Sequence, residues 1–255
     1  MMKKRLIVVT CALLLPSANA QAQRDDTVRI EVGSKLLNGR VFKPHAARVK
    51  VYVGDQLTNE WTNELTLGDS AGRPIMKWVT KTAYSPNGIT NELLQTYDLE
   101  TLQPYAFNST SSNGAFTRYT INGKELRGTR RLPNDTTTRE LSQTLDRLGF
   151  MVNASDLVPV AAGLKQGAVI TAPVWGLNMP APETRIFAVV RDTVVNVEGT
   201  MVRSWKVEER RHSDKALMAN WYLLDKSPYM VYGEVPMPNG QVRRMTEVEI
   251  PMTRR

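Results

Sequence analysis

The sequence predicts a mainly β fold, a curved antiparallel meander sheet or half-barrel with one short helix. Apolar and polar residues alternate in several segments, which is typical of half-buried antiparallel strands. Five Asn-Gly pairs accompany these segments, and this dipeptide accepts the positive φ angles of a type I′ hairpin turn. Only one stretch has a clear helical period. We therefore expect hairpins between sequential neighbours.

The first twenty residues have the features of a secretory signal peptide. A basic start, Lys3-Lys4-Arg5, precedes the apolar run Leu6–Leu15, and Ala18-Asn19-Ala20 fits the signal peptidase pocket. The apolar run is about half of the ~20 residues that span a bilayer as a helix. We expect cleavage after Ala20 or after Ala22, export to the periplasm or the medium, and no transmembrane segment after processing.

Residues 21–255 are expected to form a single β-rich domain, since β domains of this length commonly fold as one unit. The only cysteine, Cys11, lies in the signal segment, so the mature chain has no disulfide. Three of the eight excess positive charges lie there too. The remaining basic pairs are scattered, as on solvated strand edges. An exported chain with this mild charge excess is not expected to bind nucleic acid.

The expected strands follow the alternating segments in order. One apolar face comprises Val28, Ile30 and Val32, a second Ala47, Val49, Val51 and Val53, and a third Val242, Thr246, Val248 and Ile250, with Glu247 and Glu249 on the wet side of this last strand. The expected hairpins are Ile75–Tyr84 with Ile89–Tyr97, Ala115–Ile121 with Lys124–Arg131, Arg185–Val197 with Met201–Arg211, and Tyr229–Val235 with Gln241–Ile250.

Two segments depart from this alternation. Ser155–Lys165 predicts the short helix, because Ser155 can cap it and its apolar residues recur on one face. Residues 136–149 fit either a helix, with Gly149 as its C-terminal cap, or a strand.

One short motif resembles that of serine hydrolases. Gly68-Asp69-Ser70-Ala71-Gly72 matches Gly-x-Ser-x-Gly and is similar to the Gly-Asp-Ser-Gly-Gly-Pro of chymotrypsin-like proteases. The nucleophile elbow requires a helix after the serine, whereas a strand is predicted here. We interpret the motif as a polar hairpin loop and leave any chemical role of Ser70 open.

Other candidate catalytic groups have structural interpretations. His45 and His212 are isolated histidines in polar surroundings, and Glu208 and Glu209 point to opposite faces of a strand. Asp98, with Glu100, fits a turn in which its side chain bonds the backbone. The sequence has no His-Glu-x-x-His motif and no clustered metal ligands. We expect no enzymatic activity, no metal and no cofactor.

Aromatic and flexible apolar residues gather in the last third of the chain. They are interpreted either as ordinary core or as walls of a concave site for a hydrophobic ligand. Strand parity groups five candidates for such a site: Met201, Trp205, Trp221, Leu223 and Val231.

Two blocks carry a resemblance to a known kind of domain. Thr96-Tyr97-Asp98-Leu99-Glu100-Thr101-Leu102-Gln103-Pro104 and the stretch from Trp221 to Glu234 resemble an uncharacterised family of exported bacterial β-rich domains of unknown function. That family is similar in shape to the Lol-type lipoprotein carriers, whose curved sheet holds acyl chains against a helical lid. The resemblance spans about Lys77 to Val248 and implies no catalytic residue. The sequence predicts less helix than that lid requires.

Two hypotheses for function follow. The first is non-enzymatic binding of a hydrophobic or lipid-like envelope component. The second is a protein–protein interaction module of the cell envelope with no small ligand, docking through exposed strand edges.

Overall fold

The computed structural model describes residues 27–252, so the predicted signal peptide and its cleavage sites lie outside the described residues. The β-strands are β1 (Thr27–Arg29), β2 (His45–Val53), β3 (Gln56–Ser70), β4 (Arg73–Tyr84), β5 (Asn91–Asp98), β6 (Pro104–Ser111), β7 (Phe116–Asn122), β8 (Glu125–Arg131), β9 (Arg139–Thr144), β10 (Phe150–Met151), β11 (Val169–Trp175), β12 (Glu183–Val197), β13 (Thr200–Arg211), β14 (Leu217–Leu223), β15 (Met230–Pro236) and β16 (Val242–Ile250). The helices are α1 (Leu157–Ala162) and two 3₁₀ turns, η1 (Gly39–Val41) and η2 (Val152–Ala154).

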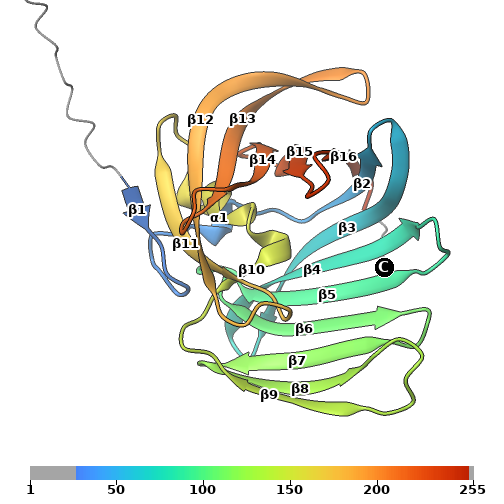
Figure 1. Cartoon of the computed structure of the whole chain (residues 1–255). Coiled ribbons are helices and arrows are strands. Elements are labelled where there is room, and N and C mark those ends of the chain that lie inside the picture. Colours follow the sequence, from blue (N-terminus) through green and yellow to red (C-terminus); the bar gives the residue numbers. More distant parts are fainter. Residues whose placement is uncertain (1–26, 253–255) are drawn as a thin grey trace, which may run out of the picture.

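All sixteen strands belong to one open, curved sheet (Figure 1). Two antiparallel meanders build it, β2 to β9 and β11 to β16, and the antiparallel pair β16–β2 joins them. The predicted β-rich half-barrel with one short helix is confirmed. The sheet is not entirely antiparallel, because the short strands β1 and β10 both pair in parallel with β11.

The four predicted hairpins are all present, as β4–β5, β7–β8, β12–β13 and β15–β16. The segment with two open interpretations forms the edge strand β9. The helix is shorter than predicted. It ends before Gly163, whose φ of 91° is one that L side chains rarely adopt, and Ser155 bonds elsewhere instead of capping it.

One face of the sheet, here called the inner face, carries the main core. Val49, Leu65 and Val207 from distant strands lie on it and are completely buried, together with Leu157 and Val158 of α1. Figure 1 shows α1 inside the hollow of the curved sheet. The opposite face is called the outer face. Among the described residues, no helix has the length and apolar character needed to cross a membrane.

The turns differ from the prediction in one respect. At four of the Asn-Gly pairs only the glycine has positive φ, and the fifth, Asn38-Gly39, begins η1. Two turns among the described residues have positive φ at both central positions, Ala71-Gly72 (53° and 79°) and Glu198-Gly199 (48° and 88°). Such primed turns match the right-handed twist of long hairpins, and these two close the long hairpins β3–β4 and β12–β13.

The predicted faces of β16 are wrong. Glu247 was expected in water, yet it is 3% exposed and lies directly opposite Val49 on the inner face. Thr246 and Val248 therefore face outward. Alternation misleads here because both faces of β16 are covered, the outer one by hairpin β12–β13. In β1, by contrast, Val28 is exposed and only Ile30, beyond its end, is buried.

Candidate functional site

Three of the five predicted ligand-binding residues lie together on the inner face. Trp205 stands opposite Leu223 and Val207 opposite Trp221 in the β13–β14 pair. Leu223 is completely buried and both tryptophans pack against the main core. The absence of a side chain at Gly233 lets the Trp221 ring lie on β15, since a Cβ atom there would approach the ring to 3.0 Å. These residues fill the hollow between sheet and helix.

The other two residues lie apart from this group. Val231 belongs to a second apolar cluster with Val197 and Leu224, because a register shift between Tyr222 and Leu223 interrupts the alternation between β14 and β15. Met201 is 65% exposed near the tip of hairpin β12–β13. The expectation that all five share one concave surface is therefore wrong for these two.

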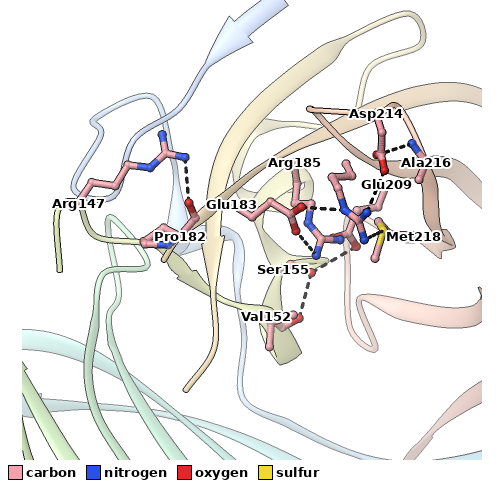
Figure 2. Close-up of polar contacts among 11 residues, drawn as sticks. Arg147, Val152, Ser155, Pro182, Glu183, Arg185, Glu209, Asp214, Ala216 and Met218 are labelled. Carbon is pink, nitrogen blue, oxygen red and sulfur yellow. Dashed lines mark hydrogen bonds and ion pairs between the residues drawn. The ribbon is translucent and has the colours of Figure 1, made fainter. Parts of the chain in front are cut away.

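The inner face also holds a buried ionic network around Arg185 and Glu209 (Figure 2). The Trp221 indole N–H donates to the Glu209 carboxylate at 2.8 Å. Arg185 lies between Glu209 and Glu183, at 3.3 and 2.8 Å, and the Ser155 hydroxyl donates to Glu209 at 3.4 Å. Glu209 is thus anchored by groups from three elements, whereas its neighbour Glu208 faces outward and pairs with Arg210, as predicted.

Three carboxyl groups on or beside this face have raised pKa values. Burial raises the pKa of Glu247 to about 8, with the charge of Asp156 acting in the same direction and a hydrogen bond from Asn63 opposing it. Burial likewise raises the pKa of Asp156 to about 7, helped by Glu209, and raises that of Glu209 itself. In all three groups, burial away from water disfavours the charged carboxylate.

The isolated candidate residues are structural or exposed. Ser70 ends β3 and leads through a tight turn into β4, so no helix follows it and the polar hairpin interpretation holds. Asp98 accepts bonds from the Glu100 and Thr101 backbone N–H groups, which is the predicted turn. His212 is exposed. His45 is not on the surface as expected. It is 2% exposed, and burial lowers its pKa.

No group of three or more His, Cys, Asp or Glu side chains within residues 27–252 has an arrangement that holds a metal ion.

A cleft on the outer face is created by hairpin β12–β13. The hairpin extends beyond β14 and arches over β14, β15 and β16 towards β2 (Figure 1). At its tip, Glu198 forms ion pairs with Arg48 at 3.0 Å and Lys50 at 2.8 Å, both on the outer face of β2. Lys50, followed by Arg48, holds the pKa of Glu198 below its usual range. We call this hairpin the arch and the space beneath it the arch cleft.

The arch cleft has a volume of about 600 Å³. Its floor is a cross-strand row on the outer face, in which Tyr222 pairs with Tyr232 and Tyr232 with Thr246. The Tyr222 and Tyr232 rings meet edge to face at 5.2 Å. The complete lining is Tyr52, Asp55, Val195, Asn196, Glu198, Tyr222, Tyr232, Glu234, Arg244 and Thr246.

The charges that line the arch cleft are already paired. Arg244 is bonded to Asp55 at 3.1 Å. Glu234 accepts bonds from Asn220 at 3.2 Å and from the Tyr232 hydroxyl at 3.5 Å. Burial, followed by the charge of Glu234, raises the pKa of both Tyr222 and Tyr232. The Thr246 hydroxyl is the exception, because it is buried and has no hydrogen-bond partner among the described residues. This oxygen has almost no accessible surface, so the cleft offers aromatic walls and paired charges.

Two solved structures are similar to this chain along most of its length. A crystal structure of a β-barrel-like protein of the domain of unknown function DUF1849 from Brucella abortus has a TM-score of 0.48 and 9% identity, and covers 86% of this chain and 100% of that chain. A DUF1329 family protein from Desulfovibrio piger has a TM-score of 0.28 and 10% identity, and covers 82% of this chain and 86% of that one. No family model and no curated protein matches the sequence. Both solved neighbours belong to families of unknown function.

Sequence reasoning missed the arch cleft, although one signal was present. Tyr222 and Tyr232 fall on strands whose other face is already apolar, so an aromatic row on the second face indicates that something covers it. The sequence predicts the hairpin of Arg185–Val197 with Met201–Arg211, but alternation does not reveal that this hairpin bends back over its own sheet.

Proposed function

We propose that the chain is a non-enzymatic binding protein of the cell envelope, and that the arch cleft takes a small hydrophobic or lipid-like molecule. One observation carries the proposal: three tyrosine rings and Val195 line a cleft of about 600 Å³ in which every charged side chain of the lining has a polar partner. Ligand pockets typically range over ~300–1,000 Å³, with aromatic walls and few polar groups.

Paired charges favour an uncharged ligand body. An apolar molecule that enters the cleft displaces water from ring faces, which is favourable, and need not break the Arg244–Asp55 or Glu198–Lys50 pair. The inner face is a poorer candidate for the same ligand, because Leu223 and its neighbours are packed, and the cavity beside α1, lined by Tyr97 and Leu157, measures only about 10 Å³.

The proposal is tested with N-phenyl-1-naphthylamine, a neutral probe whose fluorescence rises in apolar surroundings. We expect micromolar binding and displacement by monoolein. Tyr222→Ala and Tyr232→Ala should each raise the Kd about tenfold, since a buried ring contributes ~1.5–3 kcal/mol.

Two controls make the test specific. Tyr84→Ala removes an exposed tyrosine at the end of β4 and should leave the Kd unchanged. Trp205→Ala removes a ring from the inner face and should lower stability without changing the Kd. If Trp205→Ala abolished binding and both cleft variants bound normally, the ligand would belong to the inner face and the proposal would be wrong.

A second candidate, the interaction module, is favoured by one observation. Strand β9 ends the sheet and pairs only with β8, so its other edge is free within the described chain. An unpaired edge is a template for adding a strand from a partner. Native mass spectrometry of protein purified from its own host separates the two candidates, because a co-purifying lipid supports the first and a co-purifying protein the second.

A further inference from the structure

A second cleft, also of about 600 Å³, lies on the outer face beside the tip of hairpin β3–β4. The tip contributes Asp69, Ser70 and Arg73. A cross-strand row contributes the rest of the floor, since Lys77 pairs with Thr96, Thr96 with Ala106 and Ala106 with Thr120. Paired residues share a face, and this row lies opposite to the buried Met76 and Tyr97. We call this site the hydroxyl cleft.

Hydrogen-bond donors in the hydroxyl cleft are largely unused. Lys77 is exposed and forms no ion pair with any residue from 27 to 252. Arg73 has no carboxylate partner in the same range. Burial, followed by the charge of Asp98, raises the pKa of the Tyr105 hydroxyl, and the contact of that hydroxyl with the Arg73 side chain lowers it. The hydroxyls of Thr96 and Thr120 have no hydrogen-bond partner among the described residues, and neither does that of Ser70.

The acceptors near this cleft are occupied in part by the protein itself, and one oxygen of the exposed Asp69 carboxylate in the lining has no hydrogen-bond partner among the described residues. Asp69 accepts the Gly72 backbone N–H at 2.8 Å within the turn. Asp98, behind Tyr105, accepts from the Thr101 hydroxyl at 2.8 Å and from the Tyr105 hydroxyl at 3.2 Å. The cleft therefore presents two cations and several hydroxyls with few free acceptors. Such a surplus of donors is complementary to a ligand that carries several acceptor oxygens.

We propose that the hydroxyl cleft binds the phosphate group of a phosphorylated organic molecule. Arg73 would hold the group with its planar fork of N–H donors, and Lys77 would act as a point charge. Ser70, Thr96 and Thr120 would donate to the remaining oxygens. The cleft is far larger than a single phosphate ion, so the apolar floor at Ile75 and Ala106 would contact the organic part.

This assignment gives a role to the Gly-x-Ser-x-Gly match. Ser70 is a binding hydroxyl at the mouth of a cleft and not a nucleophile, because the strand β4 follows it directly. The site is separate from the arch cleft, with which it shares no residue.

Isothermal titration at low ionic strength tests the proposal with four probes: glucose 6-phosphate, inorganic phosphate, glucose, and vesicles of phosphatidylglycerol compared with phosphatidylcholine. Glucose 6-phosphate should bind more tightly than inorganic phosphate, and glucose should give no signal. Arg73→Gln and Lys77→Gln should each weaken binding about tenfold or more, as expected for the loss of a charge-assisted hydrogen bond.

Lys81→Gln is the matched control. Lys81 lies on the same strand and face as Lys77 but is already paired with Glu92 at 3.3 Å, so its loss should leave the affinity unchanged. Binding to phosphatidylglycerol vesicles that requires Arg73 and Lys77, without binding of glucose 6-phosphate, would identify the phosphate source as a lipid headgroup. Absence of binding by every phosphate probe would overturn the proposal. An effect of Lys81→Gln equal to that of Lys77→Gln would also overturn it, because it would show unspecific attraction.

Discussion

The two faces of the curved sheet differ in how their polar groups are buried and paired. On the inner face, charged groups are buried and bonded to one another, as in Arg185 with Glu209 and Glu183, and no sizeable space remains beside α1. The outer face has two clefts of about 600 Å³ each. The difference teaches that curvature alone does not locate a binding site, because the concave side is the core of this molecule.

Each of the two outer clefts lies beside the tip of a long hairpin. The hairpins β3–β4 and β12–β13 are long, and each closes with a turn that has positive φ at both central residues. The tip of β12–β13 arches over the outer face of neighbouring strands, and the tip of β3–β4 borders the second cleft. The chemistry then differs, since the arch cleft has tyrosines and paired charges whereas the hydroxyl cleft has unpaired donors.

The largest expected effect distinguishes the buried ionic network of the inner face from an exposed ion pair, because the two should contribute very differently to the free energy of unfolding. Arg185→Gln leaves the buried Glu209 without its cation, and breaking a buried pair in this way costs roughly 3–5 kcal/mol. Arg203→Gln removes an exposed arginine of β13 that pairs with Asp192 of β12 at the protein surface, and we expect no measurable change. Urea denaturation at pH 7 measures both. Equal losses would show that the inner network is no more buried than the surface pair.

The pH dependence of stability should come mainly from the inner face. The pKa of Glu247 is about 8 in the folded chain and near 4.5 when unfolded, so the folded state keeps a proton that the unfolded state releases. Stability is therefore full below about pH 4.5 and falls as the pH rises towards 8, by up to ~1.4 kcal/mol per pH unit. Asp156 acts in the same direction up to about pH 7.

Denaturation of the wild type and of Glu247→Gln at pH 5, 6.5 and 8 tests this expectation. The variant should lose less stability between pH 5 and 8, since its amide does not titrate. Outer carboxylates such as Glu198, whose pKa is lowered, lose their contribution only as the pH falls towards the acid range. Parallel curves for wild type and variant would contradict the assignment of a titrating, buried Glu247.

The smallest expected effect concerns the ion pairs that join the arch to β2. Glu198→Gln removes both ion pairs to β2 and should cost about 0.5–1 kcal/mol, because such partly exposed pairs are screened by solvent. Hydrogen exchange should accelerate in residues 193–202 and little elsewhere. Glu125→Gln, which breaks an exposed pair with Arg127 on β8, should leave exchange in the arch unchanged. Unaltered protection in Glu198→Gln would mean that apolar contacts alone fix the arch.

The sequence allowed the hairpins to be predicted because their signals are local. Alternation gave the strands of β7–β8 and β15–β16, and turn residues gave their boundaries. It did not give the β16–β2 pair, which joins segments almost two hundred residues apart. The sequence predicts that Glu247 is exposed to solvent, because alternation separates the two faces of a strand but does not show which face is more deeply buried. Burial on both sides of β16 removes even that distinction.

The candidate site was predictable in composition but not in place. The residues predicted from the sequence include Trp221 of β14 but not its neighbour Tyr222, which faces outward and lines the arch cleft. The location of the cleft depends on a hairpin that bends over its own sheet and on a register shift at Leu223. Neither feature leaves a pattern in the neighbouring residues of the sequence.

Photolabelling with a neutral, apolar diazirine probe tests the central claim most directly, because it requires no variant. After irradiation of the purified protein and digestion, mass spectrometry locates the modified residues. We predict labels on Tyr52, Val195, Tyr222 and Tyr232, and their suppression by excess monoolein. Labels confined to Trp205, Trp221 and Leu223, with suppression by the same competitor, would show that the inner face is the binding surface and would contradict the account.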